Sequence, residues 1–147
     1  MKKILFFCIL IVICGLLIHV FLQRNDWRIP EEAKSLKNPL IRSDAALKAA
    51  APLYKQFCSE CHGERGKGDG PEAMMYDPSP ADLTDARRMK ALTDGQIFFQ
   101  ITEGRKPMPS FKNKLTVDQR WQLVLLVRSF SSKSACSGAK SATTGNP

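Results

Sequence analysis

The 147-residue chain is basic, with 22 Lys and Arg against 14 Asp and Glu and a formal net charge of +8. Residues 43–131 contain 13 of the basic and 11 of the acidic residues, a net charge of only +2, so most of the excess lies in the flanking segments. This distribution and the lack of a nucleic-acid-binding motif exclude nucleic acid as a partner, and the length allows one domain with appendages.

The chain begins with a long apolar run. Lys2 and Lys3 are followed by residues 4–22, none of which carries a charge, and about 20 apolar residues suffice for a helix to cross a bilayer. No pair of small residues typical of signal-peptide cleavage follows. Residues 1–24 are therefore predicted to form an uncleaved transmembrane anchor. Since basic flanks stay cytoplasmic, the rest of the chain is expected on the other side of the membrane.

Residues 25–42 have the composition of a linker. Pro30, Pro39 and a mixture of opposite charges argue against a continuous packed element. Trp27, close to the end of the apolar run, is expected at the membrane interface.

A folded domain is predicted over residues 43–131. Ser43 is a suitable N-cap for a first helix that runs through Phe57. Pro52 is expected to kink this helix or to displace its start, because proline removes a helical hydrogen bond.

The segment Cys58-Ser59-Glu60-Cys61-His62 is the most specific pattern in the chain. C-x-x-C-H is the signature of covalent haem attachment. Cys58 and Cys61 lie near one helical face, so both sulfurs can reach the vinyl groups at one edge of a porphyrin, and His62 can then bind the iron. The motif predicts one covalently bound haem c per chain.

Zinc binding and a redox-active disulfide are the competing interpretations. A zinc site needs four ligands, and the Cys and His residues outside the motif lie in the apolar run or the C-terminal tail: Cys8, Cys14, His19 and Cys136. A thioredoxin-type pair needs a βαβ setting, and no strand pattern surrounds Cys58. Both interpretations are much weaker than haem attachment.

Glycine-rich sequence follows the motif, from Gly63 to Pro71. It resembles a phosphate-binding loop only in composition, because no strand precedes it and no Gly-Lys-Ser/Thr closes it. The segment is therefore predicted to be an ordinary loop.

Three further helices are predicted. The first covers residues 85–92. A capping box over residues 93–96 opens the second, which ends at Gly104, and a similar box over residues 116–119 opens the last. The polar residues 132–147 are predicted to be a disordered tail.

The order of these motifs resembles that of class I cytochromes c, in the short bacterial form with one haem. The resemblance extends over residues 53–130. The matching segments are Leu53-Tyr54, Cys58 to His62, Gly66 to Pro71, Pro80 to Leu83, Asp94 to Phe98, Met108 to Phe111 and Arg120-Trp121. It implies an all-α fold in which several short helices wrap around the haem and the first and last helices cross.

The resemblance also implies the haem ligands. His62 and Met108 are expected to bind the iron from its two axial sides, and the Pro71 carbonyl is expected to accept a hydrogen bond from His62. Met108 lies between two prolines and between two predicted helices. Met74 or Met75 as the second ligand, or an open iron, remain alternatives.

Several apolar residues are candidates for the haem pocket, although each is equally well explained as part of a core. With Pro71, they are Tyr76, Leu83, Phe98, Ile101 and Phe111. Four basic residues bracket Met108 and are expected to rim the exposed haem edge, where they would attract redox proteins with acidic docking faces: Arg105, Lys106, Lys112 and Lys114.

The predicted function is one-electron transfer rather than catalysis. The chain is expected to carry its haem domain on the periplasmic side of a bacterial inner membrane, held there through residues 4–22. Two alternatives remain. One is the cytochrome c subunit of a larger membrane redox complex, and the other is a haem-based binder of small ligands, which needs an open iron position.

Overall fold

A computed structural model describes residues 6–7, 9–16 and 27–139 of the chain. Its elements from residue 27 onward are helical: α2 (Glu31–Ser35), α3 (Asp44–Phe57), α4 (Ser59–His62), the 3₁₀ helix η1 (Ala73–Met75), α5 (Ala86–Ala91), α6 (Asp94–Glu103) and α7 (Val117–Ala139). The described residues contain no β-strand, only an isolated bridge between Arg105 and Met108. The predicted all-α class is confirmed.

The helices begin where the sequence places their caps. The Ser43 hydroxyl accepts a hydrogen bond from the Ala46 amide, 3.1 Å away, at the start of α3. The capping box over residues 93–96 is fully formed at α6, and the box over residues 116–119 opens α7. Helix α3 continues through Pro52, so the expected displacement of its start is wrong.

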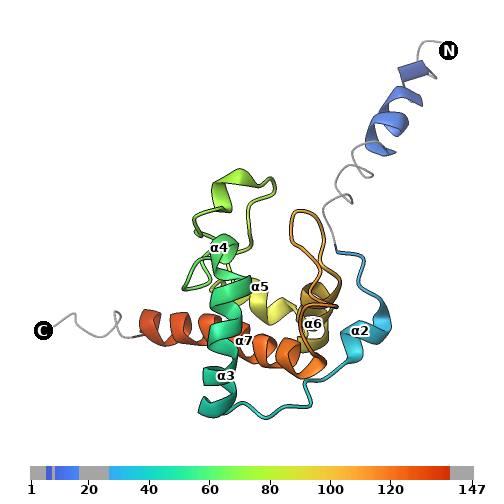
Figure 1. Cartoon of the computed structure of the whole chain (residues 1–147). Coiled ribbons are helices and arrows are strands. Elements are labelled where there is room, and N and C mark those ends of the chain that lie inside the picture. Colours follow the sequence, from blue (N-terminus) through green and yellow to red (C-terminus); the bar gives the residue numbers. More distant parts are fainter. Residues whose placement is uncertain (1–5, 8, 17–26, 140–147) are drawn as a thin grey trace, which may run out of the picture.

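The core forms where α3 crosses α7, the crossing of first and last helices that the resemblance implies (Figure 1). Ala50 is fully buried on α3, which lets the two helices approach. Tyr54 packs edge-on against Phe130 with ring centroids 5.1 Å apart, and Phe57 packs against Phe111 at 6.0 Å. Edge-to-face pairs of this kind stabilise a core beyond simple burial.

Helix α6 lies against α7 through a third aromatic pair. Phe98 stacks on Trp121 with a centroid distance of 4.0 Å and an interplanar angle of 16°. The buried Arg120 guanidinium lies 5.0 Å from the Phe98 centroid and donates to the Thr102 hydroxyl at 2.7 Å. Phe98, expected in the haem pocket, therefore belongs to the α6–α7 contact.

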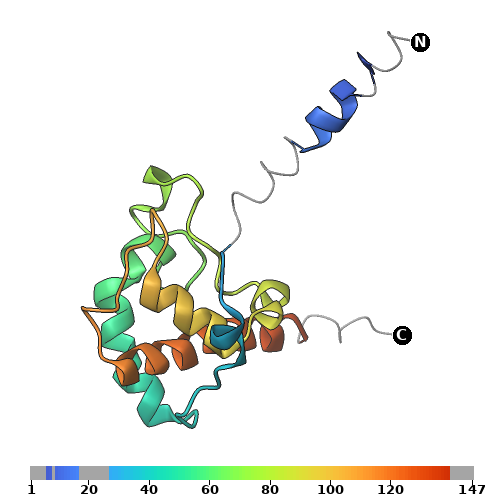
Figure 2. The same cartoon turned by 90° about the vertical axis from the view of Figure 1, so that its right-hand side faces the viewer.

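The segment predicted as a linker packs against the domain, and we call residues 27–42 the N-terminal strap. Its helix α2 lies beside α6 (Figure 1 and Figure 2). The Thr93 hydroxyl donates to the Lys34 carbonyl at 2.9 Å, and the Asn38 amide donates to the Trp121 carbonyl at 3.0 Å. Residues 27–42 of the expected linker therefore contact parts of the domain that are far away in the sequence.

The described residues near the two ends of the sequence are helical. Helix α7 continues to Ala139, so its last turns cover residues assigned to a disordered tail; the remainder, 140–147, lies outside the described residues. Residues 9–16 are helical, while the rest of the predicted anchor is described only at residues 6–7. In the described ranges, no helix combines the length and apolar character that a membrane span requires.

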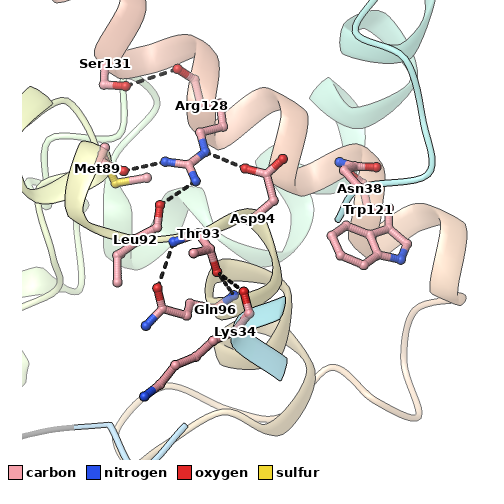
Figure 3. Close-up of polar contacts among 10 residues, drawn as sticks. All are labelled: Lys34, Asn38, Met89, Leu92, Thr93, Asp94, Gln96, Trp121, Arg128 and Ser131. Carbon is pink, nitrogen blue, oxygen red and sulfur yellow. Dashed lines mark hydrogen bonds and ion pairs between the residues drawn. The ribbon is translucent and has the colours of Figure 1, made fainter. Parts of the chain in front are cut away.

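Arg128 joins three helices at one point (Figure 3). Its Nε donates to the Asp94 carboxylate at 2.7 Å, at the start of α6. Its two terminal nitrogens donate to the Leu92 carbonyl, at 2.6 Å, and to the Met89 carbonyl, both at the end of α5. A guanidinium suits this role because its donors form a fixed planar fork.

We expect Arg128→Ala to lower the free energy of unfolding by about 1–3 kcal/mol, because it leaves two carbonyls and one carboxylate without their donor. Chemical denaturation of the holoprotein measures the change. Arg87→Ala, at an exposed position of α5, is the matched control and should stay within about 0.5 kcal/mol of wild type. Equal losses in both variants would contradict the role given to Arg128.

Candidate haem site

A cavity of about 340 Å³ lies inside the helical domain. Cys58, Cys61 and His62 line it from α4 and its N-cap, and Met108 lines it from the loop between α6 and α7. The sequence motif and the expected second ligand are thus brought to one site. A cavity of this size is within the range that binds cofactors.

The glycine-rich loop fixes α4 in place. Three successive carbonyls of α4, those of residues 60, 61 and 62, accept hydrogen bonds from the amides of Glu72 at 2.9 Å, Gly70 at 3.2 Å and Gly68 at 2.8 Å. A Cβ at Gly70 would lie 2.3 Å from the Glu60 carbonyl oxygen, so only glycine permits this approach. The loop therefore supplies hydrogen-bond donors to the backbone carbonyls of the haem motif.

The His62 ring is oriented by a backbone carbonyl. Its Nδ1 lies 3.0 Å from the Ala81 oxygen, and since a carbonyl only accepts, Nδ1 carries the hydrogen and Nε2 keeps its lone pair. Burial is the main cause that lowers the pKa of His62, and Arg88 lowers it further, which favours the neutral ring that binds metals. The predicted Pro71 carbonyl is not the partner.

Cys58 and Cys61 are thiols that are not joined in a disulfide. Burial raises the pKa of Cys58 to about 12, with a smaller contribution from Cys61. Burial and the nearby Glu72 carboxylate, whose oxygen lies 3.9 Å from the Cys61 sulfur, raise the pKa of Cys61. Within the ranges that the structure describes, no three His, Cys, Asp or Glu side chains are grouped to hold a metal ion, and zinc binding finds no support there.

The loop that carries Met108 is closed by short contacts. Helix α6 ends at Gly104, which has φ +64°. The Arg105 amide then donates to the Met108 carbonyl at 2.9 Å, and the Ser110 hydroxyl donates to the Thr102 carbonyl at 2.7 Å. These contacts hold a half-buried Met108 at the cavity.

The other methionines expected as alternatives or as core residues lie elsewhere. Met74 and Met75 are 98% and 68% exposed on η1, and neither lines the cavity. Met89 is 2% exposed in the hydrophobic core and does not line it either. Among the methionines in the described ranges, Met108 alone is placed at the cavity.

Four of the six additional pocket candidates line the cavity: Tyr76, Leu83, Ile101 and Phe111. Pro71 and Phe98 do not, because Pro71 lies at the surface of the glycine-rich loop and Phe98 stacks on Trp121. Sequence reasoning missed several lining residues, among them Trp27, Arg88, Gln100, Leu123 and Val127. Leu123 and Val127 are four residues apart on one helical face, and this spacing could have predicted that both line the cavity.

The predicted basic cluster is divided by the structure. Arg105 and Lys106 line the cavity. Lys112 instead forms an ion pair with Glu103 at 3.1 Å, and Lys114 is exposed away from the cavity lining. Only half of the cluster therefore lies at the cavity.

Comparison with known families identifies the domain. The family model described as cytochrome c oxidase, cbb3-type, subunit III matches residues 45–127. The chain belongs to this family, and as a class I monohaem cytochrome c it carries a covalently bound haem c. A c-type cytochrome domain of this kind transfers electrons.

Two solved structures are similar to the chain. A reducing HAO-like protein complex from Kuenenia stuttgartiensis contains a chain with 31% identity, covering 71% of this chain and 52% of that one, with a TM-score of 0.53. The present chain thus spans about half the length of this relative. A c-type cytochrome, KustC0563, has 35% identity over 55% of this chain and 95% of its own, with a TM-score of 0.48. No curated protein matches.

The residues at the cavity fit a haem c. Cys58 and Cys61 supply two thiols, and His62 supplies a neutral imidazole with a free lone pair. The Met108 thioether lies at the same cavity. The walls include aromatic and aliphatic side chains such as Phe57, Leu83 and Ile101. These are the donor types and the surroundings that c-type haem requires.

Proposed function

We propose that the chain is a membrane-tethered one-electron carrier in which His62 and Met108 bind the haem iron. The observation that carries this proposal is that both side chains line one cavity, whereas Met74, Met75 and Met89 do not. Ligation by His and Met raises the potential of a haem and is typical of electron-transferring cytochromes c.

Each residue of the site has a distinct task in this function. Cys58 and Cys61 form the two thioether bonds that attach the haem. The Ala81 carbonyl holds the His62 ring through Nδ1, which leaves Nε2 for the metal. Apolar walls limit the access of water, and the bound haem supplies an iron that changes by one electron between its ferrous and ferric states.

If His62 and Met108 both bind the iron, the haem has no open position, which favours electron transfer over the binding of small ligands. A ligand binder needs an open iron position, whereas the closed loop around Met108 brings a thioether to the cavity. The proposed role needs no bond-making chemistry. We therefore place the chain among carriers and not among enzymes.

We expect Met108→Ala to lower the haem potential by on the order of 0.1 V, a fraction of the roughly 0.8 V that axial ligands span. The variant should also bind added imidazole at the iron, because the thioether no longer occupies that position. Potentiometric titration and absorption spectra measure both effects. Met75→Ala, at an exposed position, is the control and should leave the potential unchanged. The ligand assignment would be refuted if Met75→Ala changed the potential and imidazole binding while Met108→Ala changed neither.

Redox partners are proposed to approach at the part of the cavity lined by Arg105 and Lys106. Arg88, on α5, is a further basic residue of the cavity lining. Basic side chains favour encounter with acidic surfaces, an effect that salt screens. Lys112 and Lys114 are left out of this docking site because they do not line the cavity.

We expect Lys106→Glu to slow oxidation of the ferrous protein by ferricyanide about tenfold at low ionic strength, because it reverses a charge at the cavity. Stopped-flow absorption measures the rate. Lys114→Glu changes the net charge equally at an exposed site away from the cavity and should have a much smaller effect. The difference should shrink at high salt, and equal rates for the two variants would remove the docking role.

A second candidate function is that of a subunit in a larger redox complex. The description of the matching family names an oxidase subunit, and the similar Kuenenia stuttgartiensis chain belongs to a complex. The same haem site would then pass electrons inside an assembly. Co-purification of stable partners at a fixed stoichiometry distinguishes this candidate from a free carrier.

Membrane attachment through residues 4–22 is supported by the exposed apolar side chains near the N-terminus. In the described part of this run every large apolar side chain is exposed: Phe6, Phe7, Ile9, Leu10, Ile11, Val12, Ile13 and Leu16. An exposed apolar surface of this extent marks a site that binds a membrane or another protein. We place the haem domain on the periplasmic side of a bacterial inner membrane.

The membrane proposal predicts that the mature protein keeps residues 1–24 and sediments with membranes, because an uncleaved apolar helix does not leave the bilayer. N-terminal sequencing and fractionation check this. Haem-containing protein that starts beyond Leu22 and stays in the supernatant would be the contrary result.

A further inference from the structure

The N-terminal strap lies outside the residues that match the cytochrome family, which begin at residue 45. It is nevertheless fixed to the domain at several points. Besides the hydrogen bonds from Thr93 and Asn38 (Figure 3), a Cβ at Gly95 would lie only 2.0 Å from the Ala33 carbonyl oxygen. Backbone contact this close requires glycine on α6, so α2 packs at one defined position on α6.

The first described residue of the strap reaches the haem cavity. Trp27 is half-buried and lines the cavity, as does Arg105 from the loop that carries Met108. The Arg105 guanidinium carbon lies 5.0 Å from the centroid of the Trp27 ring. This distance is within the range of a cation–π interaction. The expectation that Trp27 serves only as an interfacial aromatic does not account for this contact.

The contact between Trp27 and Arg105 extends to Met108 through the backbone. The Arg105 amide donates to the Met108 carbonyl at 2.9 Å, and this pair forms the bridge that closes the loop. Between them, Lys106 and Pro107 are exposed, as are Pro109 and Ser110 on the far side. Loops with so few buried contacts open readily, so one aromatic contact at Arg105 matters for how often this loop opens.

We propose that Trp27 is a positioning residue for the second iron ligand: the strap presses its indole against Arg105 and so keeps the Met108 loop closed over the cavity. The role of Met108 as a ligand rests on the proposed function, but the closure of the loop by Trp27 does not. Trp27 acts through Arg105 and need not touch the iron.

The test compares Trp27→Ala, Trp27→Phe and Arg28→Ala in the full-length holoprotein. The first readout is hydrogen exchange at the Arg105 amide, which reports loop opening whichever residue binds the iron. The second is the rate at which imidazole binds ferric haem. Loss of a cation–π contact should raise the equilibrium constant for loop opening about threefold to tenfold. Trp27→Ala should therefore accelerate both hydrogen exchange and imidazole binding by that factor.

The other variants separate the causes. Trp27→Phe keeps an aromatic face and should restore most of the protection, while Arg28→Ala, at the exposed neighbouring position, should match wild type. Arg105→Gln removes the cation but keeps the amide, and it tests the contact from the other side if Trp27→Ala yields little holoprotein. It should accelerate exchange in the same way.

The outcomes distinguish the role of Trp27 in closing the loop from the role of Met108 as an iron ligand. Unchanged exchange at Arg105 in Trp27→Ala and Arg105→Gln would overturn the role of the strap, even with Met108 on the iron. Faster exchange with an unchanged imidazole rate, together with a silent Met108→Ala, would keep the role in closing the loop but refute Met108 as the ligand. If Trp27→Phe behaves like Trp27→Ala, the aromatic contact is not the cause.

Discussion

The fold depends on a constraint that small domains rarely face, a cavity of about 340 Å³ in place of part of the core. Covalent haem c fills this space with apolar contact. The helices therefore form a wall around the cofactor, and folding and cofactor attachment are energetically coupled.

This constraint explains where the polar contacts are placed. Helices α3 and α7 build the protein core at their crossing, with Ala50 and the Tyr54–Phe130 pair, and both helices also contribute side chains to the cavity lining. The shorter elements beside the cavity, α4 and α5, are held by hydrogen bonds. The glycine-rich loop satisfies the carbonyls of α4, and Arg128 ties the end of α5 to α6 and α7. Short helices need such links, because they have little surface of their own to bury.

Local signals in the sequence predicted much of this arrangement. The caps at Ser43 and over residues 93–96 were predicted correctly, because a cap depends only on residues within one turn. The haem motif and Met108, the second ligand that the resemblance implies, line one cavity. Packing partners were harder to predict. Whether Phe98 contacts Trp121 or the haem cavity depends on the relative orientation of α6 and α7.

Features that depend on loop paths were not predictable in the same way. The choice of the Ala81 carbonyl over that of Pro71 is set by the route of the chain between the glycine-rich loop and α5. The strap was missed because its helix is short and is stabilised by Thr93, Asn38 and Gly95 contacts rather than by its own propensity. Prolines and mixed charges describe the local chain, and they do not exclude docking against another element.

Combined with the proposed membrane anchor, the attachment of the strap would also limit how far the haem can move from the membrane. Five peptide units separate Leu22 from Trp27, and an extended chain spans at most about 3.6 Å per residue. If residues 4–22 span a bilayer, Trp27 and the cavity edge beside it stay within roughly 18 Å of the end of that span. Under the proposed membrane attachment, a tether of this length would confine the electron carrier to a thin layer above the membrane. It would exchange electrons with membrane-embedded partners by small rotations, whereas a partner with its redox centre high above the bilayer would be out of reach.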